Sequence, residues 1–102
     1  MNKAFVISLD SRREQFKEVQ RSFKPYGISC ERVSAVAHTK GSVGCALSHL
    51  KIIADAKKND WPWVIVLEDD CVAREGMKDW SFISKFLIQE KAEWDLFLGG
   101  CI

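Results

Sequence analysis

The sequence lacks any long apolar run and any strong excess of charge of one sign. Its longest apolar stretch, residues 61–67, is far shorter than the roughly 20 residues that a membrane-spanning helix needs. Lys and Arg number 15 against 14 Asp and Glu, so no basic surface points to nucleic acid. The first ten residues hold a short apolar run but no small-residue cleavage site. We therefore expect a cytoplasmic protein with no membrane span and no nucleic-acid partner.

Cysteine is also too sparse and too widely spaced to define a disulfide framework. The 4 cysteines stand at positions 30, 45, 71 and 101, without a C-x-x-C pair or a nearby histidine pair. The sequence therefore predicts neither a zinc site nor a dense disulfide set, and we expect reduced, mostly buried thiols. Hydrophobic residues make up 47% of the chain, too many for a disordered protein. A length of 102 residues fits one domain with a modest core, although it is short for an enzyme with two substrates.

Short apolar runs alternate along the chain with amphipathic segments. The runs predict four strands, at 4–9, 28–36, 63–67 and 94–98. The segments between them predict three helices, at about 11–24, 42–58 and 76–91. Strands that alternate with helices form βαβ units and a mainly parallel sheet. We therefore predict an α/β fold in which the runs 4–9 and 63–67 are central strands, the second of them covered on both faces.

Each expected helix has one apolar face that should be buried in the core. The faces comprise Phe16, Val19 and Phe23 in the first helix, Val43, Leu47, Leu50 and Ala54 in the second, and Trp80, Ile83, Phe86 and Leu87 in the third. Asp10 or Ser11 is suited to cap the first helix, because a short polar side chain there accepts a hydrogen bond from a free backbone N–H.

Three consecutive carboxylates, Glu68, Asp69 and Asp70, follow the expected strand 63–67. Ligands of open α/β sheets bind beyond the carboxyl ends of the strands, and clustered acids there call for a cation. Alternate residues of an extended chain point the same way, so Glu68 and Asp70 could share one Mg²⁺ or Mn²⁺ ion. A solvated turn explains the same residues equally well. A receiver-like, Mg²⁺-binding signalling module also places acids at a strand end, but we expect too little chain after the triplet to complete that fold.

Two of these segments together resemble a known family. The run G-S-V-G-C-A-L-S-H-L-K at 41–51, followed by V-I-V-L-E-D-D at 64–70, is similar to glycosyltransferase family 25. That family comprises lipopolysaccharide-type galactosyl- and glucosyltransferases and collagen-modifying relatives. Residues 5–10, 31–36 and 94–99 follow the same order as in the family, so the resemblance covers nearly the whole chain. The two motifs at this separation are much more specific than either motif alone.

The resemblance implies a GT-A type, Rossmann-like fold in which residues 1–102 form one nucleotide-sugar-binding domain, the donor-binding half. It implies metal-assisted transfer of a hexose, galactose or glucose, from a UDP-sugar to a glycan acceptor such as lipopolysaccharide or lipooligosaccharide. Glu68 and Asp70 match the first and last acids of the family's D-x-D-like motif and are the expected ligands of Mn²⁺ or Mg²⁺. Asp69 is the expected contact to the ribose or the sugar. No residue is identified as a general base.

Further residues have both a binding and a structural interpretation. His49 lies in the family motif and is a candidate donor contact, although a lone helix histidine is more often structural. Ser8 and Asp10 stand at the end of the first strand, where the base or ribose would rest, and Asp10 could instead cap the helix. Ser8 occupies a position where the family often has Asn, and Ser42 one where it usually has Glu. Arg12 and Arg13 could bind phosphate or simply lie exposed on a surface turn. Gly41 and Gly44 could form a phosphate-binding helix start or allow close packing.

Members of this family are commonly longer than this chain. We therefore expect the acceptor site and the general base to lie in a missing C-terminal half. A truncated, non-catalytic relative that keeps only nucleotide or metal binding is the alternative. An incomplete sheet with an exposed edge also predicts self-association.

Overall fold

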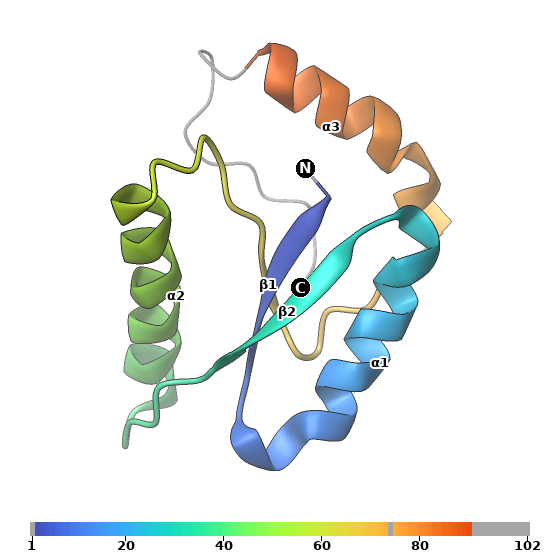
Figure 1. Ribbon diagram of the computed structural model, residues 1–102. Coiled ribbons are helices and arrows are strands. Elements are labelled where there is room, and N and C mark those ends of the chain that lie inside the picture. The colour runs from blue at the N-terminus through green and yellow to red at the C-terminus, as the bar shows by residue number, and fades with distance from the viewer. Residues whose placement is uncertain (1, 74, 91–102) are drawn as a thin grey trace.

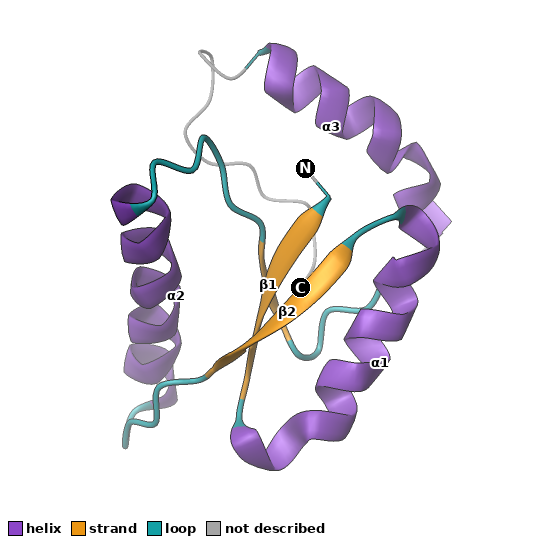
Figure 2. Cartoon of the chain, viewed as in Figure 1, coloured by secondary structure: helices purple, strands orange, loops and turns teal. Residues whose placement is uncertain are grey.

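The computed structural model describes residues 2–73 and 75–90 and shows an α/β fold with a parallel sheet (Figures 1 and 2). The strands are β1 (Lys3–Ser8), β2 (Ser29–Ser34) and β3 (Val66–Glu68). The α-helices are α1 (Arg13–Phe23), α2 (Gly41–Lys58) and α3 (Trp80–Gln89). Short 3₁₀ helices at Asp10–Arg12, Lys24–Tyr26 and Glu75–Asp79 flank α1 and precede α3. The predicted fold class is confirmed, while the predicted strand 94–98 lies outside the described residues.

The order of the strands brings their carboxyl ends to one edge. β1 lies between β2 and β3 and is parallel to both. Ser8 is in register with Ser34, and Ile7 with Glu68, so all three strands end at the same level. The central position predicted for the run 4–9 is confirmed.

The run 63–67 is less deeply placed than the sequence predicts. In the part of the chain that the structure describes, β3 pairs with β1 alone, and its side chains are half-buried or exposed. The register pairs Phe5 with Val66, and the Phe5 N–H donates to the Ile65 carbonyl at 2.9 Å, so only the last part of the run pairs with β1. The predicted cover on both faces is therefore wrong for the side chains of β3, while the predicted central position is not tested, because the expected strand 94–98 lies outside the described residues.

Two layers of helices enclose the sheet. Ala4 and Val6 of β1 are buried in a core with Val19 and Phe23 of α1, as the spacing in α1 predicts. Trp80, at the start of α3, packs against the same core. Residues of a strand point alternately to opposite faces, so the other face of β1 is left for a different helix. That helix is α2, which lies across the sheet from α1 and α3 (Figure 1).

The exposed and buried faces of α2 are reversed relative to the prediction. The helix buries Gly44, Ser48, Ile52 and Ala56 against the sheet. The predicted stripe of Val43, Leu47, Leu50 and Ala54 is exposed instead, with Leu50 at 58%. The small side chains of Gly44 and Ser48 allow the helix to approach the chain that follows β2, and this contact sets its rotation.

In α3 the predicted burial of the apolar face is confirmed for Leu87, which is buried, but is wrong for Phe86, which is exposed.

The start of α1 also differs from the prediction. The residue before α1 is Arg12, and neither Asp10 nor Ser11 caps the helix. The carboxylate of Asp10 instead accepts hydrogen bonds from Arg32 and Ser34 of β2. These bonds, with the positive charge of Arg32, hold the pKa of Asp10 below its usual value. The resulting stabilisation is present above the ordinary pKa of an aspartate and is lost as the pH falls through the lowered one.

The cysteines divide into different states. Cys30 is buried and free, Cys45 is exposed and free, and Cys71 is disulfide-bonded. The expectation of reduced, mostly buried thiols is therefore wrong for Cys71 and for the exposed Cys45, while Cys101 lies outside the described residues.

Among residues 2–73 and 75–90, no helix has both the length and the apolar character needed to cross a membrane.

Candidate functional site

A cavity of about 480 Å³ lies at the edge where the three strands end. This volume is in the range of small-ligand sites. Its walls come from the turn after β1, the loop after β2, the first turns of α2 and the acidic triplet that begins at the end of β3. The cavity therefore joins the two motifs, residues 41–51 and 64–70, that are distant in the sequence.

The three acids of the triplet all line the cavity, in three different environments. Asp69 is 15% exposed and accepts a hydrogen bond from Nε of Arg12 at 3.0 Å. Glu68 faces α2 and interacts with Cys45 and His49. Asp70 is exposed and has no hydrogen-bond or ion-pair partner in residues 2–73 and 75–90. Asp70 is thus the carboxylate most open to a cation, while the metal and donor contacts expected of the triplet remain predictions.

Arg12 lies in the cavity wall, whereas Arg13 does not line the cavity. The Arg12 side chain is 43% exposed, and its hydrogen bond to Asp69 uses only Nε. A guanidinium carries five N–H donors, so the remaining donors are open to an anion. The arrangement places a positive charge beside the acids in the cavity wall.

The other predicted contacts lie outside the cavity lining. The Ser8 hydroxyl is buried and donates to the backbone oxygens of Leu9 and Arg12. Asp10 is engaged with Arg32, and His49 lies beside Glu68. Arg32 was not predicted as a site residue; its guanidinium also donates to the Ser8 carbonyl at 3.0 Å. A lone arginine in an alternating strand was the available signal, but only the strand order shows what it contacts.

The family-like motif in α2 consists of two pairs of residues, each four positions apart. In the first pair, Ser48 donates to the Gly44 carbonyl and accepts the N–H of Val36, both at 2.8 Å. A Cβ atom on Gly44 would lie 2.6 Å from the Val36 oxygen. This pair therefore holds the loop after β2, which forms one wall of the cavity. Of the two explanations for Gly44, close packing is the one that its contacts support.

Replacing Gly44 with Ala should destabilise the protein, because the new methyl group meets a backbone oxygen that cannot move without displacing the loop. We expect a loss of about 1–3 kcal/mol, the usual cost of an overpacked site. Gly41→Ala is the matched control: no atom lies within 4 Å of its Cβ position. Alanine also favours helix there, so this variant should be neutral or slightly stabilising. Chemical denaturation of both variants tests the difference, and equal stability would contradict the packing role of Gly44.

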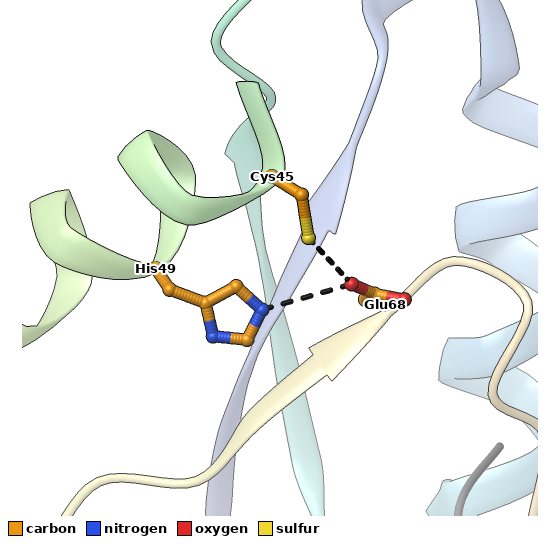
Figure 3. Close-up of side chains that lie close together, drawn as sticks. All are labelled: Cys45, His49 and Glu68. Carbon is orange, nitrogen blue, oxygen red and sulfur yellow. Dashed lines mark hydrogen bonds and ion pairs between the residues drawn. The ribbon is translucent and has the colours of Figure 1, made fainter. Parts of the chain in front are cut away.

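The second pair, Cys45 and His49, points toward Glu68 (Figure 3). The Cys45 thiol donates to Oε1 of Glu68 at 2.9 Å, and Nε2 of His49 lies 3.6 Å from the same oxygen. The hydrogen bond to Glu68, with smaller contributions from burial and from the carboxylate charge, raises the pKa of the Cys45 thiol. One carboxylate oxygen thus connects the end of β3 to α2.

Glu68→Gln should increase the alkylation rate of Cys45 near neutral pH. The amide oxygen of Gln is a neutral and weaker acceptor than the carboxylate, so both the hydrogen bond and the charge that raise the thiol pKa are weakened; the thiolate fraction then rises and the pH–rate profile shifts to lower pH. Peptide mapping after iodoacetamide treatment separates Cys45 from the buried thiol Cys30. Asp70→Asn removes a neighbouring charge without touching Cys45 and should leave the rate unchanged. An unaltered profile in Glu68→Gln would show that the contact does not form in solution.

Comparison with protein families gives a match to the same part of the chain. The family model for glycosyltransferase family 25 (LPS biosynthesis protein) matches residues 36–101. This span is more than half of the chain and includes α2, β3, α3 and the acidic triplet. No curated protein sequence matches at a significant level. The matched span starts at Val36, whose N–H donates to Ser48. The match favours a glycosyltransferase over the receiver-like alternative.

Proposed function

Because the chain belongs to glycosyltransferase family 25, we propose that its cavity binds the UDP-hexose donor of a transferase of lipopolysaccharide biosynthesis. The hexose, galactose or glucose, would be transferred to a glycan acceptor such as lipopolysaccharide or lipooligosaccharide. The observation that supports the proposal best is the meeting of the α2 motif and the acidic triplet in one cavity at the carboxyl ends of the strands. Open α/β sheets bind nucleotides at such edges.

The side chains of the triplet fit a hard divalent cation, Mg²⁺ or Mn²⁺, which prefers carboxylate oxygens and keeps positions for water and phosphate oxygens. Asp70 is exposed and unpaired among the described residues, so it would hold the ion, with Glu68 as the second acid. When bound, the ion supplies charge stabilisation for the departing diphosphate.

The chain's own residues would bind and orient the donor. Arg12 places a guanidinium beside the phosphates and also fixes the carboxylate of Asp69. A carboxylate held in this way is suited to accept hydrogen bonds from the hydroxyls of a ribose or sugar. Gly44 and Ser48 set the position of the opposite wall through their contacts with Val36. Together these residues would hold the anomeric carbon in place for attack by an acceptor hydroxyl.

Calorimetric titration with UDP tests donor binding. We expect binding in the presence of Mn²⁺ or Mg²⁺ and its loss on addition of EDTA, with UMP binding more weakly because it lacks the second phosphate. Absence of UDP binding with either metal would overturn the proposal. UDP-galactose and UDP-glucose, each with a lipooligosaccharide acceptor, then test transfer. Binding without transfer would support the alternative of a relative that keeps nucleotide binding alone.

A further inference from the structure

Three side chains of different chemistry gather between α2 and the end of β3 (Figure 3). Cys45 and His49 are four residues apart on α2, so they lie on the same face of the helix. The sulfur of Cys45, a ring nitrogen of His49 and a carboxylate oxygen of Glu68 all lie within 4.8 Å of one another. The Glu68 oxygen is the common neighbour, 2.9 Å from the sulfur and 3.6 Å from Nε2.

We propose that Cys45, His49 and Glu68 form a binding site for a borderline-soft divalent transition-metal ion, with Zn²⁺ as the best fit. Zinc binds sulfur at about 2.3 Å and nitrogen or oxygen at about 2.0–2.2 Å, so tetrahedral ligands lie roughly 3.5 Å apart. Two of the three separations, 2.9 Å and 3.6 Å, lie near that value, and all three are within 4.8 Å, so the side chains would need only to adjust around an ion. On binding, the thiol loses its proton to solvent and the thiolate becomes a ligand.

The site shares Glu68 with the one proposed for a hard cation, but its other two ligands differ in chemistry. Sulfur and imidazole ligands select Zn²⁺ or Co²⁺, whereas Mg²⁺ and Mn²⁺ prefer oxygen ligands such as those of Asp70. Three protein ligands leave one tetrahedral position open for water or another small ligand. The surroundings allow this: Cys45 is exposed, and the side chains of His49 and Glu68 are 39% and 49% exposed. An ion can therefore enter from solvent without unfolding the chain.

The site adjoins the donor cavity, because Cys45 and Glu68 line both. Metal binding at this cluster does not depend on the identity of the donor or on any catalysis. A measurement on the chain alone, without nucleotide, thus tests the metal site independently of the proposed transferase function.

Cobalt is a spectroscopic probe for this site. Co²⁺ added anaerobically to the metal-free chain of residues 1–102 should give a sulfur-to-cobalt charge-transfer band in the near ultraviolet and tetrahedral bands in the visible, saturating at one ion per chain. Zn²⁺ should remove both sets of bands. Cys45→Ser should eliminate the charge-transfer band. His49→Gln and Glu68→Gln should weaken Co²⁺ binding by at least about tenfold, since even losing a residue that only supports a metal ligand costs that much.

Matched controls come from the same chain. Cys30→Ala removes the other free thiol of the described residues, and His38→Gln removes the only other histidine. Both should leave the cobalt spectrum unchanged, while circular dichroism checks that every variant is folded. Zn²⁺ should also protect Cys45, but not Cys30, from alkylation. A wild-type chain without the charge-transfer band, or a band that survives in Cys45→Ser, would overturn the proposal.

Discussion

Replacing Asp70 with Asn should abolish the metal-dependent binding of UDP while leaving the fold intact. Asp70 is exposed and has no partner among the described residues, so an amide of the same shape disturbs no contact there. The substitution removes the negative charge that a hard cation requires. In calorimetry with UDP and Mn²⁺ we expect affinity to fall by at least about a hundredfold, the upper end of the cost of losing a residue that only supports a metal ligand.

The control for this variant is Asp60→Asn. Asp60 is exposed in the turn after α2 and does not line the cavity. Its positive φ of 53° is readily adopted by Asn, so the same change of charge is made without backbone strain. UDP binding should match that of the wild type. Undiminished Mn²⁺-dependent binding in Asp70→Asn would refute the role of this acid as a ligand.

Ile52→Ala should destabilise the protein far more than Leu50→Ala. Ile52 is 2% exposed on the face of α2 that meets the sheet, whereas Leu50 is 58% exposed. Truncating a buried isoleucine removes its burial and leaves a cavity, which costs about 2–5 kcal/mol. Truncating an exposed leucine typically changes the free energy of unfolding by no more than about 0.5 kcal/mol.

Urea denaturation monitored by circular dichroism measures both free energies. The helical spacing of Val43, Leu47 and Leu50 predicts the opposite order, so this pair of variants decides between the sequence pattern and the structure. Ala has a higher helix propensity than Ile and about the same as Leu. Helix propensity therefore slightly stabilises Ile52→Ala and cannot be the cause of its larger predicted loss of stability. A Leu50→Ala variant at least as unstable as Ile52→Ala would mean that α2 is rotated relative to the arrangement described above.

The helices show when the local sequence pattern predicts which face of a helix is buried. In α1 the apolar residues Phe16, Val19 and Phe23 are surrounded by charged residues, so only one face can be buried, and the prediction is confirmed. In α2 apolar residues occur on more than one side, and periodicity cannot distinguish among them. The close contact of Gly44 with Val36 decides which side meets the sheet. The sequence allows close packing at Gly44 as one of two interpretations, but a small residue gives no hydrophobic signal that would identify its partner or the buried side of the helix.

The site was predictable in a similar, partial way. The position of the acidic triplet after an apolar run predicts its place at a strand end, and the structure puts all three acids in one cavity. The partners of the acids were not predictable. Arg12 is 57 residues from Asp69, and Cys45 is 23 residues from Glu68. The sequence contains no C-x-x-C or histidine pair to indicate zinc, and the proposed cluster forms only because Glu68 of β3 meets two side chains of α2.

By itself the sequence determined the alternation of strands and helices, the parallel α/β class and the motif that relates the chain to its family. These features depend on neighbouring residues, whose spacing reflects the geometry of one helix or one strand. The tertiary structure alone decided which face of α2 is buried and which groups surround each acid. Such contacts depend on strand order and register, which bring Ser8, Ser34 and Glu68 to one edge from distant parts of the chain. The chemistry of the cavity therefore follows from the packing of elements that no local pattern connects.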